Sequence, residues 1–314
     1  MKNKSNMKLI MLVVSILCIA LLITPVCTAG LGAKDIIKKN SRINISKTNN
    51  PQETAGTEYW ALIFAVGIYK NNPDADRPSM LEAADNLYDV LLSSPEWQPD
   101  HIHVIKGEQA TGKTLVQQLR WLIQNADEDD MVLVYLTTHG SSLKDLNGYP
   151  RDLPPKDEAD GADEILFMYE GFDKWYAFIW DDLLNFLLSL IKGQGLCLIV
   201  DSCYSGGFND LPFGSVGLSD YSANDFVEGL AEELATQGRI VLMSSQENEV
   251  SYGSQFSEFI ISGLSGWADI LFGNGDGINS AEEAFAFAEF WVNLGGQQHP
   301  TMLDLYPGEF PLTT

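Results

Sequence analysis

The sequence has few basic residues for its content of acids. It holds 19 Lys and Arg against 43 Asp and Glu, which gives a formal net charge of −24 at pH 7. Phosphate backbones and anionic lipid headgroups repel such a chain, so its charge argues against nucleic acid and an anionic membrane as partners. The excess of acid favours cationic substrates and high solubility, although a merely solvated acidic surface would have the same composition.

Cysteine is also scarce. Of four cysteines, two fall within residues 1–29, which leaves Cys197 and Cys203. These two cannot pair, because on one extended strand their Cα atoms would lie ~20 Å apart, whereas a disulfide needs about 4.4–6.8 Å. The protein therefore depends on its core for stability, and Cys197 is most simply an inert core residue.

The apolar run at the N-terminus is short. Residues 1–29 combine three lysines with an apolar core over residues 9–23 and a small-residue stretch ending at Ala29, which is the pattern of a signal peptide. The core is shorter than the ~20 apolar residues of a comfortable membrane span. We therefore expect a secreted or extracytoplasmic protein, with an uncleaved signal anchor as the alternative. Residues 30–58, polar and basic, are expected to form a linker or pro-segment.

Two apolar runs end in reactive side chains. Residues 196–200 are apolar without a break, which is typical of a strand buried on both faces, and Asp201 and Cys203 follow at once. Residues 131–136 form a second such run, which leads to His139. Strand ends are where α/β proteins place their sites. Either residue alone could be structural, but on neighbouring strands they would supply a nucleophile and a general acid/base.

Strand and helix patterns alternate along the chain. We expect helices over residues 79–92, 114–126, 180–191, 226–236 and 256–264, and strands over residues 60–68, 101–105, 131–136, 165–168, 196–200 and 240–243. This alternation predicts an α/β fold with a mostly parallel sheet between helix layers.

The two strand-end motifs resemble those of a known family. THG at 138–140 and DSCYSGG at 201–207 are similar to the His-Gly and Asp-x-Cys-x-Gly motifs of the caspase-like cysteine peptidases, which include caspases, metacaspases and legumains. The resemblance covers residues 59–265 and includes YWALIFAVGIY, AADNLYDVL and DGADEIL. DSC and DGADE resemble prokaryotic metacaspase-like members, whereas EVSYG at 249–253 resembles legumains. The family implies a three-layer caspase-like sandwich with a mostly parallel sheet of about six strands.

The resemblance also implies roles for individual residues. Cys203 would be the nucleophile and His139 its acid/base partner, with the backbone N–H groups of Gly140 and Cys203 forming the oxyanion hole. Asp201 would lie in the pocket for the residue preceding the cut, where a carboxylate favours Arg or Lys. Arg77 could face that pocket instead and make it suited to Asn or Asp, as in legumains.

These features predict a secreted cysteine endopeptidase that cuts protein or peptide substrates and requires no cofactor. Residues 59–265 would form the peptidase domain, and residues 266–314 a C-terminal extension. The alternative from another class is a catalytically inactive, exported binding module on the same fold.

A phosphate-binding loop is a further alternative. Residues 107–114, GEQATGKT, match G-x-x-x-x-G-K-T between an expected strand and helix, and Asp201 could pose as the magnesium-binding acid of a nucleotide-binding protein. Against this, Glu108 would repel phosphate, an exported protein meets little ATP, and His139 and Cys203 would have no role.

A calcium-loop pattern lies near the C-terminus. Asn274, Asp276 and Glu283 fit ligand positions of an EF-hand loop, and a helix is expected from Ala281. Phe272 stands at the first ligand position and cannot coordinate a cation. We therefore expect a degenerate loop kept for its turn, with calcium as a weak possibility.

Overall fold

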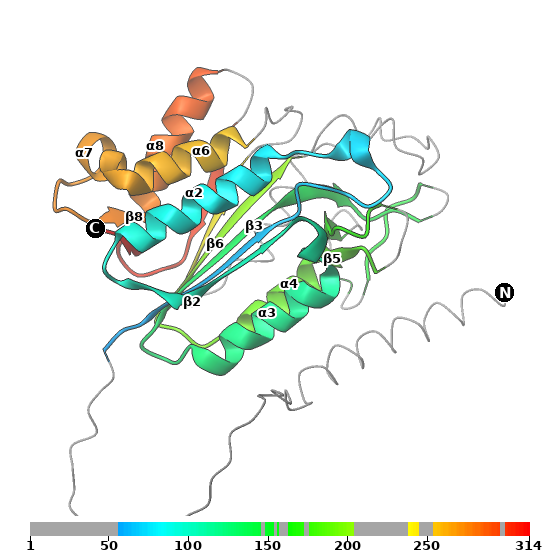
Figure 1. Ribbon diagram of the computed structural model, residues 1–314, viewed down its shortest axis with the longest axis horizontal. Coiled ribbons are helices and arrows are strands. Elements are labelled where there is room, and N and C mark those ends of the chain that lie inside the picture. The colour runs from blue at the N-terminus through cyan, green and yellow to red at the C-terminus, as the bar shows by residue number, and fades with distance from the viewer. Residues whose placement is uncertain are drawn as a thin grey trace, which may run out of the picture. The chain divides into compact units, whose positions relative to one another are not determined.

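The apolar runs of the sequence form the strands of one sheet (Figure 1). The computed structural model describes residues 56–145, 148–153, 156, 163–172, 176–203, 238–244, 254–295 and 299–314, and at Cys203 only the backbone. The order of the main path is β2-β1-β3-β6-β7-β9. Its strands are β1 (Tyr59–Ala65), β2 (Trp97–Lys106), β3 (Met131–Ser142), β6 (Gly195–Cys203), β7 (Arg239–Met243) and β9 (Thr301–Asp304). Only β9 pairs antiparallel along this path, so the predicted mostly parallel sheet is confirmed.

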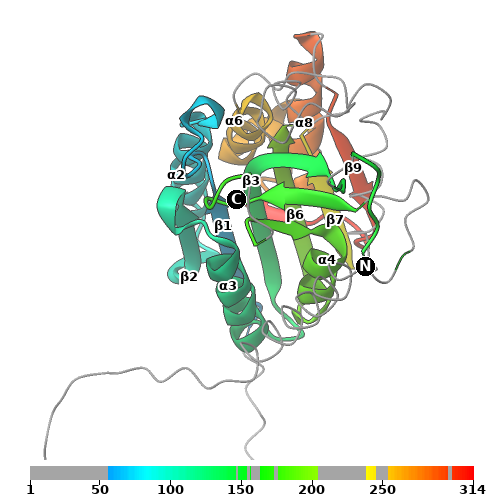
Figure 2. The ribbon, with the colours of Figure 1, turned by 90° about the vertical axis from the view of Figure 1, so that its right-hand side faces the viewer.

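Helices cover both faces of the sheet, as predicted. Figure 2 shows α2, α6 and α8 on one face and α3 and α4 on the other. Their bounds are α2 (Ser79–Ser93), α3 (Gly112–Asn125), α4 (Asp181–Ser189), α6 (Gln255–Ser262) and α8 (Ala281–Leu294). Each contributes an apolar stripe at helical spacing, and that of α2 consists of the predicted positions Met80, Ala83, Ala84, Leu87 and Leu91, all buried. The result is the three-layer α/β sandwich that the sequence predicts.

Strand β3 continues beyond its expected end at residue 136. Its last residues pair antiparallel with β4 (Glu164–Phe167), which in turn pairs with β5 (Phe178–Trp180). This hairpin supplies hydrogen-bond partners for the polar residues that follow the apolar run, so His139 and Gly140 lie inside a strand. The loop expected over residues 141–163 therefore begins later, after Ser142.

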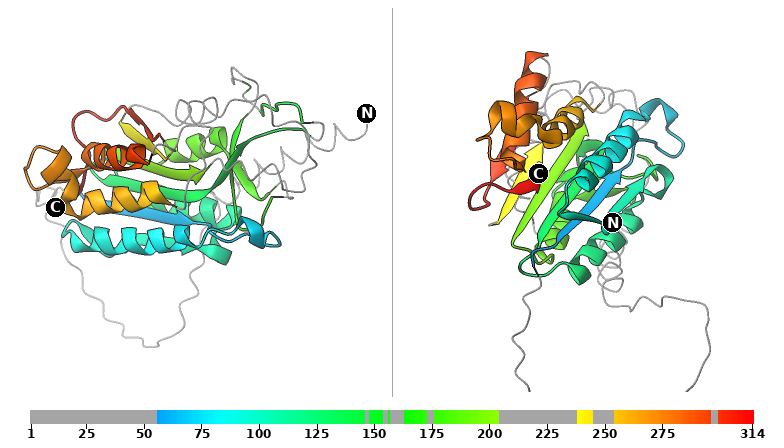
Figure 3. Two further views of the ribbon diagram at one scale, coloured as in Figure 1. Left: turned by 90° about the horizontal axis from the view of Figure 1, so that it is seen from above. Right: turned by 60° about the vertical axis from the view of Figure 1, so that its left-hand side comes forward.

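The C-terminal residues 266–314, predicted as an extension, are integrated into the fold (Figure 3). Strand β9 pairs with β7 and covers the edge that β7 would otherwise expose. Helix α8 packs against α6, and the indole nitrogen of Trp97 donates to the carbonyl of Leu312 at 2.7 Å. The smaller elements here are η4 (Gly263–Trp267), α7 (Ala268–Phe272), β8 (Asn279–Ser280) and β10 (Pro311–Thr313), and earlier ones are η1 (Pro73–Ala75) and η2 (Gly107–Gln109). The helix expected over residues 226–236 lies outside the described residues.

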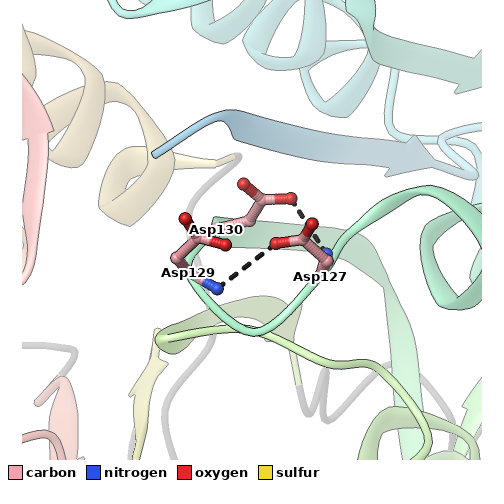
Figure 4. A group of neighbouring side chains, drawn as sticks. All are labelled: Asp127, Asp129 and Asp130. Atoms are coloured by element: carbon pink, nitrogen blue, oxygen red, sulfur yellow. Dashed lines mark hydrogen bonds between the residues drawn. The ribbon is translucent and has the colours of Figure 1, made fainter. Parts of the chain in front are cut away.

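A buried carboxylate ties the start of β1 to the turn before β3. Asp130 is 4% exposed, and its oxygens accept hydrogen bonds from the backbone N–H of Glu58 at 2.9 Å and from the indole of Trp60 at 3.0 Å. It also accepts the N–H of Asp127 at 2.9 Å, and Asp127 in turn accepts the N–H of Asp129, as Figure 4 shows. Asp127, Asp129 and Asp130 lie close enough to share a cation, but the oxygens of Asp130 are already engaged by protein N–H groups.

We expect Asp130→Ala to destabilise the protein by about 2–4 kcal/mol, because the substitution leaves three N–H donors without their charged acceptor. The measurement is urea unfolding followed by circular dichroism. Asp129→Ala, at an exposed position of the same turn, is the matched control and should change stability by at most about 0.5 kcal/mol. Equal unfolding midpoints for the two variants would contradict this account of Asp130.

Candidate active site

Strand register brings His139 and Cys203 side by side. Strands β3 and β6 are parallel neighbours, and their aligned pairs end with Thr137 opposite Asp201 and His139 opposite Cys203. Neighbouring strands of a sheet lie about 4.8 Å apart. Two residues that are 64 positions apart in the sequence therefore lie next to each other at the carboxyl end of the sheet. This is the juxtaposition that the sequence analysis required but could not itself establish.

The imidazole of His139 is held in one tautomer. Its Nε2 lies 2.9 Å from the carbonyl oxygen of Ala75, and since a carbonyl can only accept, Nε2 carries the proton. Nδ1 is then the nitrogen without a proton in the neutral ring, and it is the atom that gains a proton when the ring becomes charged. The ring is 2% exposed and stacks on Tyr69, with ring centroids 5.0 Å apart. The packing fixes the orientation of the imidazole before any substrate binds.

Burial keeps His139 neutral. The pKa of its imidazole is lowered from 6.5 to about 4, chiefly by desolvation and in smaller part by the positive charge of Arg77. The Ala75 carbonyl and the charge of Asp76 oppose these effects. A neutral imidazole at pH 7 is the form that accepts a proton from a thiol, and the lowered pKa makes this imidazole a weaker base than a free one.

Tyr69 holds the end of β3 in place by hydrogen bonds, a role that the sequence analysis did not predict. Its hydroxyl accepts the backbone N–H of His139 at 2.9 Å and lies 2.9 Å from the hydroxyl of Thr138. Thr138 donates onward to the carbonyl of Phe167 in β4. The signal was present in the sequence, since Tyr69 is the last residue of YWALIFAVGIY, but nothing in that run shows where its hydroxyl points.

Asp201 is buried under the strand ends rather than exposed to solvent. It is 1% exposed, and its Oδ2 accepts a hydrogen bond from Ser257 of α6. The Ser257 hydroxyl lies 2.6 Å from that of Tyr135, which therefore donates to it. Burial raises the pKa of the Asp201 carboxyl, and the hydroxyls of Ser257 and Ser244 partly offset this. Among the described residues, Asp201 Oδ1 has no hydrogen-bond partner.

Further acids lie near Asp201 at the starts of two helices. Burial raises the pKa of Glu258, and the nearby negative charges of Asp201 and Glu82 raise it further. Helices α2 and α6 both begin at this end of the sheet, where the hydroxyls of Ser79 and Ser254 lie 3.2 Å apart. This end of the molecule is therefore suited to a cationic group.

The remaining predicted site residues also lie at this end. The guanidinium of Arg77 donates to the carbonyl of Asp76 at 2.8 Å, and its positive charge lowers the pKa of His139. Gly140 lies within β3 opposite Leu166 of β4. The register thus gathers His139, Gly140, Asp201 and the backbone of Cys203 at the carboxyl end of the sheet, and Arg77 lies near enough to His139 to lower the pKa of its imidazole.

In the loop that matches a phosphate-binding motif, protein oxygens already accept hydrogen bonds from the backbone N–H groups at the start of α3. Thr111 caps α3 by accepting the backbone N–H of Thr114 at 3.1 Å, and their hydroxyls lie 2.8 Å apart. The Glu170 carboxylate accepts the N–H of Gly112, and burial raises the pKa of Glu170. A phosphate at this helix N-terminus would meet a carboxylate, so the geometry argues against a nucleotide site at Lys113.

Two sets of acidic residues are candidate metal sites. In the loop near the C-terminus, Glu283 accepts the backbone N–H groups of Asn274 and Ser280, and Asp269 accepts those of Gly275, Asp276 and Gly277. Protein N–H groups therefore engage the carboxylates on which a calcium loop would rely. The weak candidate set Asn274, Asp276 and Glu283 stays a prediction.

A second acidic group was not recognised from the sequence, because its members come from distant segments. Oxygens of Asp163, Asp181 and Asp182 lie within 4.8 Å of one another, and the first two residues are buried. Burial raises the pKa of Asp163 to about 6, with the charges of Asp181 and Asp152 adding to the effect. Among the described residues Asp163 Oδ1 has no hydrogen-bond partner. Backbone N–H groups of Leu153, Glu164 and Asp182 engage Oδ2 of Asp163 and both oxygens of Asp181. The observation that favours a hard cation such as Ca²⁺ here is therefore the buried Oδ1 of Asp163 beside two further carboxylates.

Comparison with known proteins agrees with this geometry. Residues 82–212, which include His139 and Cys203, match the family model described as metacaspase, peptidase C14 domain. Metacaspase-1 of Schizosaccharomyces pombe is 34% identical over 106 residues, covering 33% of this chain and 22% of the relative. Metacaspase-1 of Saccharomyces cerevisiae is 26% identical over 176 residues, covering 54% of this chain and 39% of the relative. The first relatives are thus matched over only about a third of their own length.

A solved structure supports the fold over a longer span. A protein from Geobacter sulfurreducens superposes with a TM-score of 0.54 at 14% identity, covering 82% of this chain and 99% of the other. Among the described residues, none of the helices combines the length and apolar character of a membrane span. Over residues 82–212, which hold the paired strand ends, this chain is similar to the metacaspase peptidase C14 domain.

Proposed function

We propose that this protein is an exported cysteine endopeptidase that cuts proteins or peptides after Arg or Lys. The observation that carries the proposal is the register of β3 and β6, which sets His139 beside Cys203 at the carboxyl end of the sheet. Export rests on the signal-peptide pattern of residues 1–29, with a signal anchor as the alternative.

The dyad would work in two steps. The Cys203 thiol gives its proton to Nδ1 of His139, and the sulfur attacks the scissile carbonyl carbon to form a tetrahedral oxyanion. His139 then protonates the leaving amine, and a thioester remains. In the second step His139 takes a proton from water, the hydroxide displaces the thiolate, and the thiolate recovers its proton. The N–H groups of Gly140 and Cys203 would stabilise the oxyanion, at ~3 kcal/mol for each donor. No step requires a cofactor.

The proposed preference for Arg or Lys rests on three acidic residues at the carboxyl end of the sheet, Asp201, Glu258 and Glu82. Asp201 is buried with one oxygen fixed by Ser257, so a substrate cation could bind the other without reorganising the carboxylate. Glu258 and Glu82 add negative charge at the surface nearby. If Arg77 instead faces the pocket, the site would suit Asn or Asp.

The peptidase proposal predicts that Cys203→Ala and His139→Ala each reduce turnover of peptide amides by at least ~10³-fold, since each removes one half of the dyad. Cys197→Ala is the matched control, because Cys197 is buried and burial raises the pKa of its thiol, so it should keep wild-type turnover. If Cys203→Ala behaves like the wild type, the protein is a binding module or acts through another group.

The pH dependence follows from the lowered pKa of His139. The base must be neutral to accept the thiol proton, so kcat/KM should persist as pH falls through 6.5 and decline near pH 4. An unfolded chain takes up this proton at about 6.5, so the stability associated with neutral His139 is lost as pH falls from 6.5 toward 4. NMR titration of the imidazole, with His139→Ala to assign the signal, isolates the group. A midpoint near 6.5 would show that the ring is not buried in solution.

The specificity proposal predicts that Arg and Lys are preferred over Asn and Asp in a panel of otherwise identical substrates. Ser257→Ala should raise KM for Arg substrates roughly tenfold with little change in kcat, because Asp201 loses the hydroxyl that fixes its carboxylate. Ser262→Ala, at the exposed end of the same helix, is the control. A preference for Asn or Asp that Arg77→Ala abolishes would replace the basic assignment with the mixed-charge one.

We further propose that Asp163, Asp181 and Asp182 bind Ca²⁺ as a structural ion. At pH 7.5, Ca²⁺ at a hundred times its Kd should stabilise the fold by about 2.7 kcal/mol, and Asp163→Asn should remove the effect. Because the pKa of Asp163 is raised to about 6, protons compete with the ion and the effect should fade below pH 6. Asp276→Asn is the control. A thermal shift that survives Asp163→Asn but not Asp276→Asn would move the ion to the C-terminal loop.

A further inference from the structure

A pocket lies at the opposite end of the sheet from His139 and Cys203. Its volume is about 420 Å³, and it is partly open to solvent. One row of paired residues at the starts of three strands lines it, because Val132 of β3 lies beside Leu196 of β6, and Leu196 lies beside Arg239 of β7. Ligand pockets measure about 300–1,000 Å³, so this one is large enough for a small organic molecule. We call it the Arg239 pocket.

Arg239 places a buried positive charge in the wall of this pocket. The residue is 3% exposed, and its guanidinium donates to the side-chain oxygen of Asn185 in α4 at 3.0 Å. Leu188 and Ser189 of the same helix also line the pocket, so the Arg239 side chain crosses from the sheet to α4 along the pocket wall. Asn185 is neutral, so its hydrogen bond orients the guanidinium without cancelling its charge. An anion bound beside the guanidinium would offset the cost of burying that charge.

The other charged residue in the described lining is also a cation. Lys192 lies in the turn between α4 and β6, and its ammonium group is 3.4 Å from the carboxylate of Glu128. Both side chains of this ion pair are well exposed, at 63% and 84%, so the pair is weak and a bound anion could replace Glu128. Among the described residues that line the pocket, none is acidic. In a chain with 43 acidic and 19 basic residues, such a lining favours an anion.

The rest of the lining favours a ligand with an apolar body. Apolar surface comes from Val132, Leu188, Ile191, Leu196 and Pro307. Apolar walls with a few polar groups that fix orientation are the usual composition of a small-molecule site. The planar guanidinium of an arginine matches the two oxygens of a carboxylate. A molecule with a carboxylate at one end and an apolar group at the other therefore satisfies both parts of the pocket.

We propose that the Arg239 pocket binds a small organic carboxylate, with its charge beside Arg239 and Lys192 and its apolar body against α4 and Leu196. The site is separate from the dyad, since seven positions of β6 lie between Leu196 and Cys203, which is about 23 Å at ~3.3 Å per residue. The ligand joins the starts of three strands to α4, so it stabilises the folded chain by mass action and takes no part in peptide hydrolysis.

Calorimetric titration of the full chain with benzoate tests the proposal. Benzoate should bind saturably at one site, with a dissociation constant on the order of 1 mM for a ligand of this size. Benzyl alcohol has the ring without the charge, and inorganic phosphate has the charge without the ring. At equal ionic strength each should bind at least about tenfold more weakly than benzoate. The amide NMR signals of Gly195 and Gly238, which line the pocket, should shift along the same binding curve.

Two variants and a control locate the binding. Arg239→Met keeps an unbranched side chain and removes its charge, so it should weaken benzoate binding by at least about tenfold. Because Arg239 is buried, Lys192→Glu gives a second test at an exposed position, where the fold tolerates the change and the new negative charge should weaken binding by at least about fivefold. Lys113→Met, at the exposed start of α3, removes a cation outside the pocket and should bind benzoate like the wild type.

Three results would each overturn the proposal. The first is a wild type that shows no saturable binding of benzoate. The second is binding that neither Arg239→Met nor Lys192→Glu weakens, which would place benzoate elsewhere. The third is benzyl alcohol or phosphate binding as tightly as benzoate, which would remove the need for either the charge or the apolar body.

Discussion

The site depends on the parallel pairing of β3 with β6. The backbone hydrogen bonds of this pair set one register, and a slip of one residue would move His139 from Cys203 to a different neighbour. Buried apolar residues on both strands fix that register, since the runs from Met131 and Leu196 are enclosed by helices on both faces. The hydrophobic core thus determines the catalytic geometry, and the antiparallel hairpin β4–β5 secures the end of β3 where the apolar residues stop.

Burial favours the neutral form of both His139 and Asp201, so it shifts their pKa values in opposite directions. For the imidazole, desolvation favours the neutral form, which is the form needed to accept a proton, so enclosure prepares the base. For the carboxyl of Asp201, desolvation disfavours the charged form and raises its pKa, so enclosure leaves a carboxylate that a cation would stabilise. Ser257 donates to Oδ2 of Asp201, and the Ser257 hydroxyl accepts in turn from Tyr135. An arginine or lysine in the pocket would offset the cost of burying the charged form of Asp201. The proposed specificity and the lowered pKa of His139 would then both follow from burial at this end of the sheet.

The sequence allowed the sheet, its helix layers and the two strand ends at His139 and Cys203 to be predicted, because these depend on patterns that are local along the chain. Apolar runs mark buried strands, and the residue that follows each run marks a strand end. Contacts that join distant segments could not be predicted. Tyr69 and Asp163 act through partners whose positions only the fold establishes. The integration of residues 266–314 was missed for the same reason, since β9 is short and half exposed and has no apolar run of its own.

Helix α6 connects two surfaces of different chemistry. Its first turn carries Ser257 and Glu258 at the carboxyl end of the sheet, where Glu258 lies near the acids Asp201 and Glu82. It runs away from the strand ends at about 1.5 Å per residue, toward the uncharged aromatic surface of α7 and α8. Between residues 284 and 295 of α8 the one charged residue is Glu289, so the acids near Asp201 lie at the other end of this helix layer from a nearly uncharged surface.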